Sequence, residues 1–279
     1  MALVMTFGTT PAVAAMPTSR HAVATAIGVS IALIYSTYSG MLLRAPLDAL
    51  NLPPVPYLRS ALTSLGDAIA LIAIVALAAW RSPLQVMGVS GLAAPIGRPA
   101  LWALLWLVPA LLACLLLTRP ATNADGITWL GFGGPVVEEF VYRGLAIGVL
   151  VRFCGWHWLP ACLLPAVFFG LGHWGQGDDP ASIAGIVALT GFGGLLFGWL
   201  FVRWRFNLWP SMFLHIGLNT LWLVFDLGEN ALGGWLGNVM RIGVLLIAIA
   251  ATFWLAPPKV RPAAGRAICR KHLPGAAGI

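Results

Sequence analysis

The sequence predicts an all-α membrane protein, folded as a polytopic bundle of about eight transmembrane helices. Of its 279 residues, 59% are hydrophobic and only 9% are charged, and the mean hydropathy is +0.89. A globular domain carries roughly 25% charged residues. Because so few charges cannot cover the surface of a water-soluble protein of this size, most of that surface must face membrane lipid.

The spans themselves are identified by length, since a membrane-crossing helix needs about 20 mostly apolar residues. Short connections rich in proline, arginine and aspartate separate them. The stretch 128–151 is interrupted by charges and the stretch 157–174 is short, so the count is approximate. Candidate spans cover about 22–43, 61–80, 100–118, 128–151, 157–174, 181–202, 207–226 and 236–256. An N-terminal segment (1–21) precedes this bundle (22–256), and a basic C-terminal tail (257–279) follows it.

Basic residues set the predicted orientation. With the N-terminus inside the cell, eleven of the 16 basic residues lie on the cytoplasmic side, and Arg44, Arg59, Arg119 and Arg241 lie outside. The positive-inside rule therefore predicts cytoplasmic termini. The expected location is the plasma membrane of a prokaryote. The net charge of +7 comes from singly scattered residues and the tail, which favours anionic lipid over nucleic acid as a partner. The oligomeric state cannot be read from the sequence.

An unusual cluster of charges interrupts the fourth span. Glu138, Glu139 and Arg143 fall within six residues there, although a charge at the centre of a membrane helix costs on the order of 3 kcal/mol. Glu139 and Arg143 are four residues apart and can pair on one helix face. Glu138 is rotated from Glu139 by about 100° and points elsewhere. A purely structural ion pair needs one acid, and the second acid indicates a functional site.

Two neighbouring spans carry further polar residues. Phe169 and His173 are four residues apart at the end of the fifth span, as are His215 and Asn219 in the seventh. A single histidine in an apolar helix is more often a core residue than a catalyst. Two histidines, an amide and a diacid in three nearby spans instead predict one shared polar pocket, which also relieves the cost of burying each group.

Glu138-Glu139-x-x-x-Arg143, Phe169-x-x-x-His173 and His215-x-x-x-Asn219 together resemble the motif set of the CAAX protease and bacteriocin-processing (abortive-infection) family, which includes the type II CAAX prenyl endopeptidases. Each motif is weak alone, but their order and placement in successive spans are specific. The resemblance covers about 128–226, the expected protease core. It implies an intramembrane endopeptidase, whose substrate is a peptide or a protein that is membrane-associated or prenylated.

The resemblance also implies roles for these residues. Glu138 and His173 would hold and deprotonate a water, His215 and Asn219 would face the oxyanion, and Arg143 would anchor Glu139. Family members have been described both as glutamate proteases and as metalloproteases, so a zinc site made by Glu138, His173 and His215 is the alternative. The metal-free version, with no cofactor, is favoured because it gives Asn219 a role and because Arg143 adds positive charge nearby.

Other functions fit less of the sequence. Gly88-Val-Ser90-Gly91 matches the GxSG string of rhomboid-type serine proteases, but it lies between spans and leaves the glutamates unexplained. A transporter would use intramembrane acids and histidines as an ion path, yet the chain shows no repeated halves. A non-enzymatic immunity or scaffold protein remains an alternative, because a fold alone does not imply turnover.

Overall fold

The protein is described by a computed structural model, which covers residues 19–121 and 126–256; the rest of the predicted N-terminal segment and the basic tail lie outside this range. The described residues form helices joined by turns and loops, and they contain no strand. Its elements follow in the order α1 (Ser19–Leu42), α2 (Arg44–Ala49), α3 (Leu58–Ala79), α4 (Pro83–Met87), α5 (Gly97–Leu117), η1 (Ile127–Gly133), α7 (Gly134–Glu138), η2 (Glu139–Ile147), α8 (Gly148–Arg152), α9 (Trp158–Leu171), η3 (Trp174–Gln176), α10 (Pro180–Arg203), α11 (Trp209–Val224) and α12 (Trp235–Leu255).

Each predicted span corresponds to helical structure. By length and composition, six helical stretches of the described chain are able to cross a membrane, and they contain α1, α3, α5, α9 with η3, α10 and α12. The predicted span 128–151 is helical as η1, α7, η2 and α8, but it holds the charged cluster. The predicted span 207–226 is α11, which has only 16 residues. The chain is thus an all-helical, multi-pass membrane protein, and the total of eight spans stays a prediction.

Side chains in two of the short connections cap the first turn of the helix that follows. Ser82 accepts a hydrogen bond from the backbone N–H of Gln85 at the start of α4, and the Gln85 side chain caps in return. Asp179 does the same with Ser182 before α10, where Pro180 occupies the first helical position. A proline fits there because the first backbone N–H of a helix has no partner within the helix.

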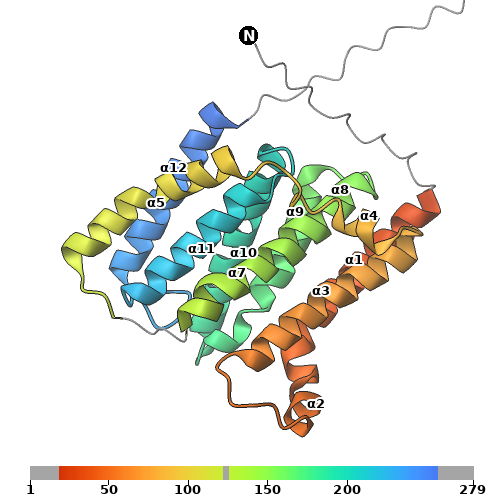
Figure 1. Ribbon diagram of the computed structural model, residues 1–279, viewed down its shortest axis with the longest axis horizontal. Helices are drawn as coiled ribbons and strands as arrows, with labels where there is room; N and C mark the ends of the chain where they lie inside the picture. Colours follow the sequence, from red (N-terminus) through yellow and green to blue (C-terminus); the bar gives the residue numbers. More distant parts are fainter. Residues whose placement is uncertain (1–18, 122–125, 257–279) are drawn as a thin grey trace, which may run out of the picture.

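The helices form three groups that lie side by side (Figure 1). α1 packs on α3 at one side of the bundle, and α5 packs on α11 and α12 at the other. α9 and α10 lie between them with the helix that carries the glutamates. One buried apolar cluster joins α1 and α3 to η2, α8 and α9, and a second joins α5 to α10, α11 and α12.

Glycines allow α9 and α10 to pack closely. A Cβ on Gly170 would lie 2.5 Å from the Val187 carbonyl oxygen, and one on Gly194 would lie 3.2 Å from the Cα of Ala166. A Cβ on Gly198 would lie 3.1 Å from the Cys162 sulfur. Gly194 and Gly198, which are four residues apart in α10, therefore both serve the close packing of α10 on α9. Small residues let membrane helices approach in this way, where dispersion rather than the hydrophobic effect drives association.

Candidate active site

The two adjacent glutamates occupy different environments. They lie at the junction of α7 and η2, where the helix widens to π geometry over Glu139–Ile147. The Glu139 side chain is sealed, with 0% of its surface exposed, whereas 33% of the Glu138 side chain is exposed. Short π-helical segments inside membrane and soluble helices are frequent at functional sites. The predicted division, in which one acid is paired and the other points elsewhere, is present.

The sealed glutamate forms the predicted ion pair. Arg143 Nη1 lies 3.2 Å from Glu139 Oε1, and only 1% of the arginine side chain is exposed. The guanidinium carbon lies 4.3 Å from the centre of the Phe169 ring and 5.5 Å from that of Phe197. A cation is attracted to the face of an aromatic ring, so these rings stabilise a charge that has left water.

His215 connects the two glutamates. Its Nδ1 atom lies 2.9 Å from Glu139 Oε1, and its Nε2 atom lies 3.7 Å from Glu138 Oε2. Since the carboxylate of Glu139 accepts, Nδ1 carries the proton, and Nε2 is the nitrogen that faces Glu138. A distance of 3.7 Å is too long for a direct hydrogen bond. His215 therefore donates to the sealed acid and presents its other nitrogen to the accessible one.

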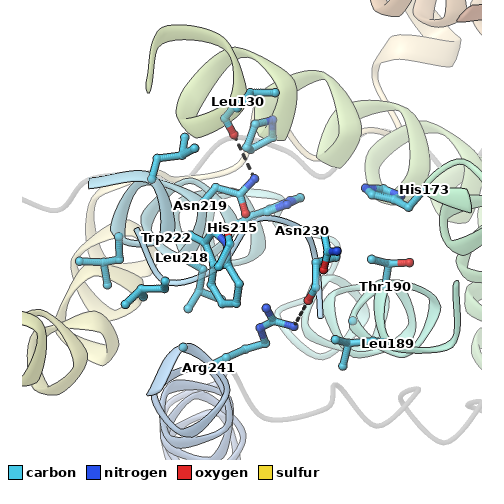
Figure 2. Close-up of a pocket in the computed structure, with 18 of the residues that line it drawn as sticks. Leu130, His173, Leu189, Thr190, His215, Leu218, Asn219, Trp222, Asn230 and Arg241 are labelled. Atoms are coloured by element: carbon cyan, nitrogen blue, oxygen red, sulfur yellow. Dashed lines mark hydrogen bonds between the residues drawn. The ribbon is translucent and has the colours of Figure 1, made fainter. Parts of the chain in front are cut away.

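His173 and Asn219 are each held by a backbone carbonyl. His173 Nδ1 lies 2.7 Å from the carbonyl oxygen of Phe169, and the rings of these two residues are 4.7 Å apart. Asn219 Nδ2 donates a hydrogen bond of 3.0 Å to the carbonyl oxygen of Leu130 in η1 (Figure 2). In each residue one N–H group donates to the protein backbone. This leaves Nε2 of His173 as an acceptor and the second N–H of Asn219 as a donor.

One cavity of about 480 Å³ collects the candidate residues that remain accessible. Glu138, His173, His215 and Asn219 all line it. Its volume is in the range of sites that enclose small ligands. Glu139 and Arg143 lie behind this wall, so they can act only through the residues that they hold.

The zinc alternative requires three ligands to converge. Among residues 19–121 and 126–256, no three side chains of histidine, cysteine, aspartate or glutamate are grouped so that they could hold a metal ion. Glu138, His173 and His215 as placed here thus do not form the expected ligand set, and the absence of a cofactor stays a prediction. The rhomboid-like string is also accounted for: Ser90 is buried between α4 and α5, outside the cavity, where Gly91 takes a positive φ of 80°.

Two polar positions in spans were not predicted. Arg241, expected on the outer side of the membrane, lies in the second turn of α12 and lines the cavity. Asp67 in α3 accepts hydrogen bonds from Ser36 (3.0 Å) and Ser39 (3.1 Å) of α1, and the Ser36 hydroxyl lies 3.2 Å from that of Tyr142. Arg241 lies within the predicted span 236–256 and Asp67 within the predicted span 61–80. A single charge inside an apolar stretch was therefore the signal that could have identified both residues.

The fold and site together define a multi-pass membrane protein with a Glu/His centre in a cavity between its helices. Residues 56–221, more than half of the chain, match the model of the family described as type II CAAX prenyl endopeptidase Rce1-like, and the chain belongs to that family. The family implies a peptidase. No curated protein and no solved structure shows significant similarity to the chain.

Proposed function

We propose that this chain is an intramembrane glutamate endopeptidase, which hydrolyses a peptide bond of a membrane-associated or prenylated protein. The observation that carries the proposal is the division between Glu138 and Glu139. The first side chain is 33% exposed in the cavity, the second is fully sealed, and His215 lies between them. An accessible acid beside an oriented histidine is the arrangement that water activation needs.

The charges of the cluster support this assignment. Two ionised glutamates, Arg143 and a protonated His215 sum to zero, so the cluster as a whole costs less to bury than any of its members alone. In this state the Nε2 atom of His215 carries a proton that it can donate into the cavity. Neutral His215 would use its only proton on Glu139, so donation to an oxyanion requires the imidazolium form.

The hydrolytic step then follows from these positions. Glu138 removes a proton from a water whose other hydrogen is accepted by His173 Nε2, and the water oxygen bonds to the carbonyl carbon of the substrate. Asn219 and His215 donate to the oxyanion that forms. When the C–N bond breaks, Glu138 returns its proton to the leaving amine. The products are one fragment with a new carboxylate and one with a new amino group.

Glu139 and Arg143 are positioning residues in this proposal. Glu139 orients the His215 ring through Nδ1, and Arg143 supplies the positive charge that keeps Glu139 ionised in an apolar setting. Neither residue lines the cavity. Their loss is expected to act on substrate turnover through the orientation of His215 and through folding.

The test is Glu138→Gln in the full-length protein in liposomes, with a prenylated peptide as substrate and mass spectrometry to locate the cleaved bond. The change preserves shape but removes the base, so hydrolysis should fall by at least about 100-fold, while insertion and thermal stability stay unchanged. Asp226→Asn neutralises an exposed acid outside the cavity and serves as the matched control. Hydrolysis by Glu138→Gln within threefold of wild type would refute the role of base.

A further inference from the structure

The cavity has a second polar region, which is rich in hydrogen-bond donors. Arg241 reaches into it from the second turn of α12, near Asn230 (Figure 2). Gln176 lines the cavity as well. Arg241 Nη1 donates a hydrogen bond of 2.9 Å to the Ala231 carbonyl oxygen, and its guanidinium carbon lies 4.3 Å from the centre of the Trp222 ring. These two contacts hold the arginine side chain against the cavity wall.

Arg241 keeps unused donors in this position. It forms no ion pair with any acidic residue in the described part of the chain, and only Nη1 has an acceptor there. Its other nitrogens are not sealed in the protein. Glu229 lines the same cavity but is exposed and lies beyond ion-pair distance. A cation within an apolar span that has no acidic partner among the described residues is typical of a functional site.

The side-chain amides of Asn230 and Gln176 also present hydrogen-bond donors rather than acceptors. The Asn230 side-chain oxygen accepts from the Leu232 N–H at 3.0 Å, and the Gln176 side-chain oxygen accepts from the Ala231 N–H at 3.3 Å. Both amides therefore use their acceptors on the protein, which leaves their NH₂ groups without an acceptor among residues 19–121 and 126–256. A guanidinium and two amide donors in one region of the cavity favour an anion with several acceptor oxygens.

From these contacts we propose that Arg241, with Asn230 and Gln176, binds the C-terminal carboxylate of the peptide substrate. The inference rests on the proposed peptidase function, because it assigns a second region of the same cavity. Glu138 and His215 then act on a bond upstream of that terminus. Hydrolysis adds the water oxygen to the carbonyl carbon, and the departing amine belongs to a short fragment whose original carboxylate is still held by Arg241.

Two peptides that differ only at their C-terminus test the proposal. Each ends in a prenylated cysteine and three apolar residues, one with a free carboxylate and one with an amide, and the full-length protein is assayed in liposomes. Wild type should cleave the acid peptide with a kcat/KM about 10- to 100-fold higher, the range expected for charge-assisted hydrogen bonds. In Arg241→Gln, the kcat/KM for the acid peptide should fall to the value for the amide peptide. The kcat/KM for the amide peptide should stay within threefold of its wild-type value.

Arg203→Gln is the matched control, because Arg203 also lies over an aromatic ring, that of Phe253 at 5.9 Å, but does not line the cavity. It should keep the wild-type ratio of acid to amide. If Arg241→Gln fails to fold, Arg241→Lys replaces it and should weaken the preference about three- to tenfold. Equal cleavage of both peptides by wild type, or an equal loss on both in Arg241→Gln, would overturn the carboxylate site.

A binding measurement separates this proposal from the proposed function. The fluorescent acid and amide peptides are titrated against Glu138→Gln, which retains the donors around Arg241. At least tenfold tighter binding of the acid peptide supports the carboxylate site even if wild type hydrolyses neither peptide. Equal binding overturns the site even if wild type hydrolyses both.

Discussion

Glu139→Gln and Arg143→Met, made singly and together, form a double-mutant cycle on the buried ion pair. The two side chains are 3.2 Å apart and only 0% and 1% exposed, so neither charge can turn to water when its partner is removed. Breaking a buried pair from one side costs about 3–5 kcal/mol. The double variant leaves no lone charge from the pair, so it should be much less destabilised than the sum of the two single changes.

The single changes should not be equal, because Glu139 has a second partner. In Arg143→Met, the Glu139 carboxylate still receives the hydrogen bond from His215 at 2.9 Å. In Glu139→Gln, both Arg143 and His215 lose a carboxylate, and Arg143 keeps only the Phe169 and Phe197 rings. Glu139→Gln should therefore lie near the upper end of the range and Arg143→Met near the lower end. A coupling energy of about 2–3 kcal/mol is expected between them, at the upper end of the range for residues in contact.

The assay is the free energy of unfolding in mixed detergent micelles, measured for all four proteins of the cycle. Arg59 and Asp48 provide an exposed control pair, with Nη1 and Oδ1 2.6 Å apart and side chains 57% and 45% exposed. Because solvent screens such pairs, Arg59→Met should cost no more than about 1 kcal/mol. Additive losses in the Glu139/Arg143 cycle would show that the two residues do not stabilise each other and would refute the argument.

Three further outcomes follow from the fold and the site. Exhaustive treatment with EDTA or phenanthroline should leave hydrolysis intact; one bound zinc per chain, with activity lost on chelation and restored by zinc, would contradict the metal-free mechanism. Tyr142→Phe removes the hydroxyl next to Ser36 and should cost about 1 kcal/mol of stability with activity within threefold, whereas a tenfold loss of activity would place Tyr142 in the catalytic machinery. Gly170→Ala puts a Cβ 2.5 Å from the Val187 oxygen and should lower the free energy of unfolding by about 1–3 kcal/mol. Gly193→Ala, with nothing within 4 Å of its Cβ, should be nearly neutral, and equal effects of the two changes would refute close packing at Gly170.

Hydropathy and local spacing predicted those features that depend on a single helix. Each apolar stretch became helical, and the four-residue spacing of Glu139 and Arg143 produced the ion pair, since residues four apart share a helix face. Local spacing carries no information on how helices rotate against one another. His215 of α11 donates to Glu139 as well as facing the cavity. This contact depends on the packing of α11 against α7, which no motif encodes.

Single charges in apolar stretches were harder to interpret than clusters. Asp67 did not stand out because its partners Ser36 and Ser39 belong to another span and are common in membrane helices. Arg241 was counted among the residues outside the membrane, although it lies within the predicted span 236–256. Arginines near the ends of membrane helices usually reach the membrane surface, so the position of Arg241 gave no signal of a cavity. Arg241 contacts the Trp222 ring of α11 and the Ala231 carbonyl oxygen of the segment between α11 and α12, and the positions of both are set by tertiary structure.

The adjacency of the two glutamates explains why they cannot exchange roles. Arg143 is four residues from Glu139, and both are sealed behind the cavity wall. The residue four positions after Glu138 is Tyr142, whose hydroxyl lies near Ser36 of α1, so Glu138 has no cation on its own face of the helix. Among the described residues, the nitrogen that faces Glu138 is Nε2 of His215, 3.7 Å from Glu138 Oε2. A single step along the helix thus separates an acid fixed by the protein from an acid available to a water, and Glu139→Gln should not be rescued by the carboxylate next to it.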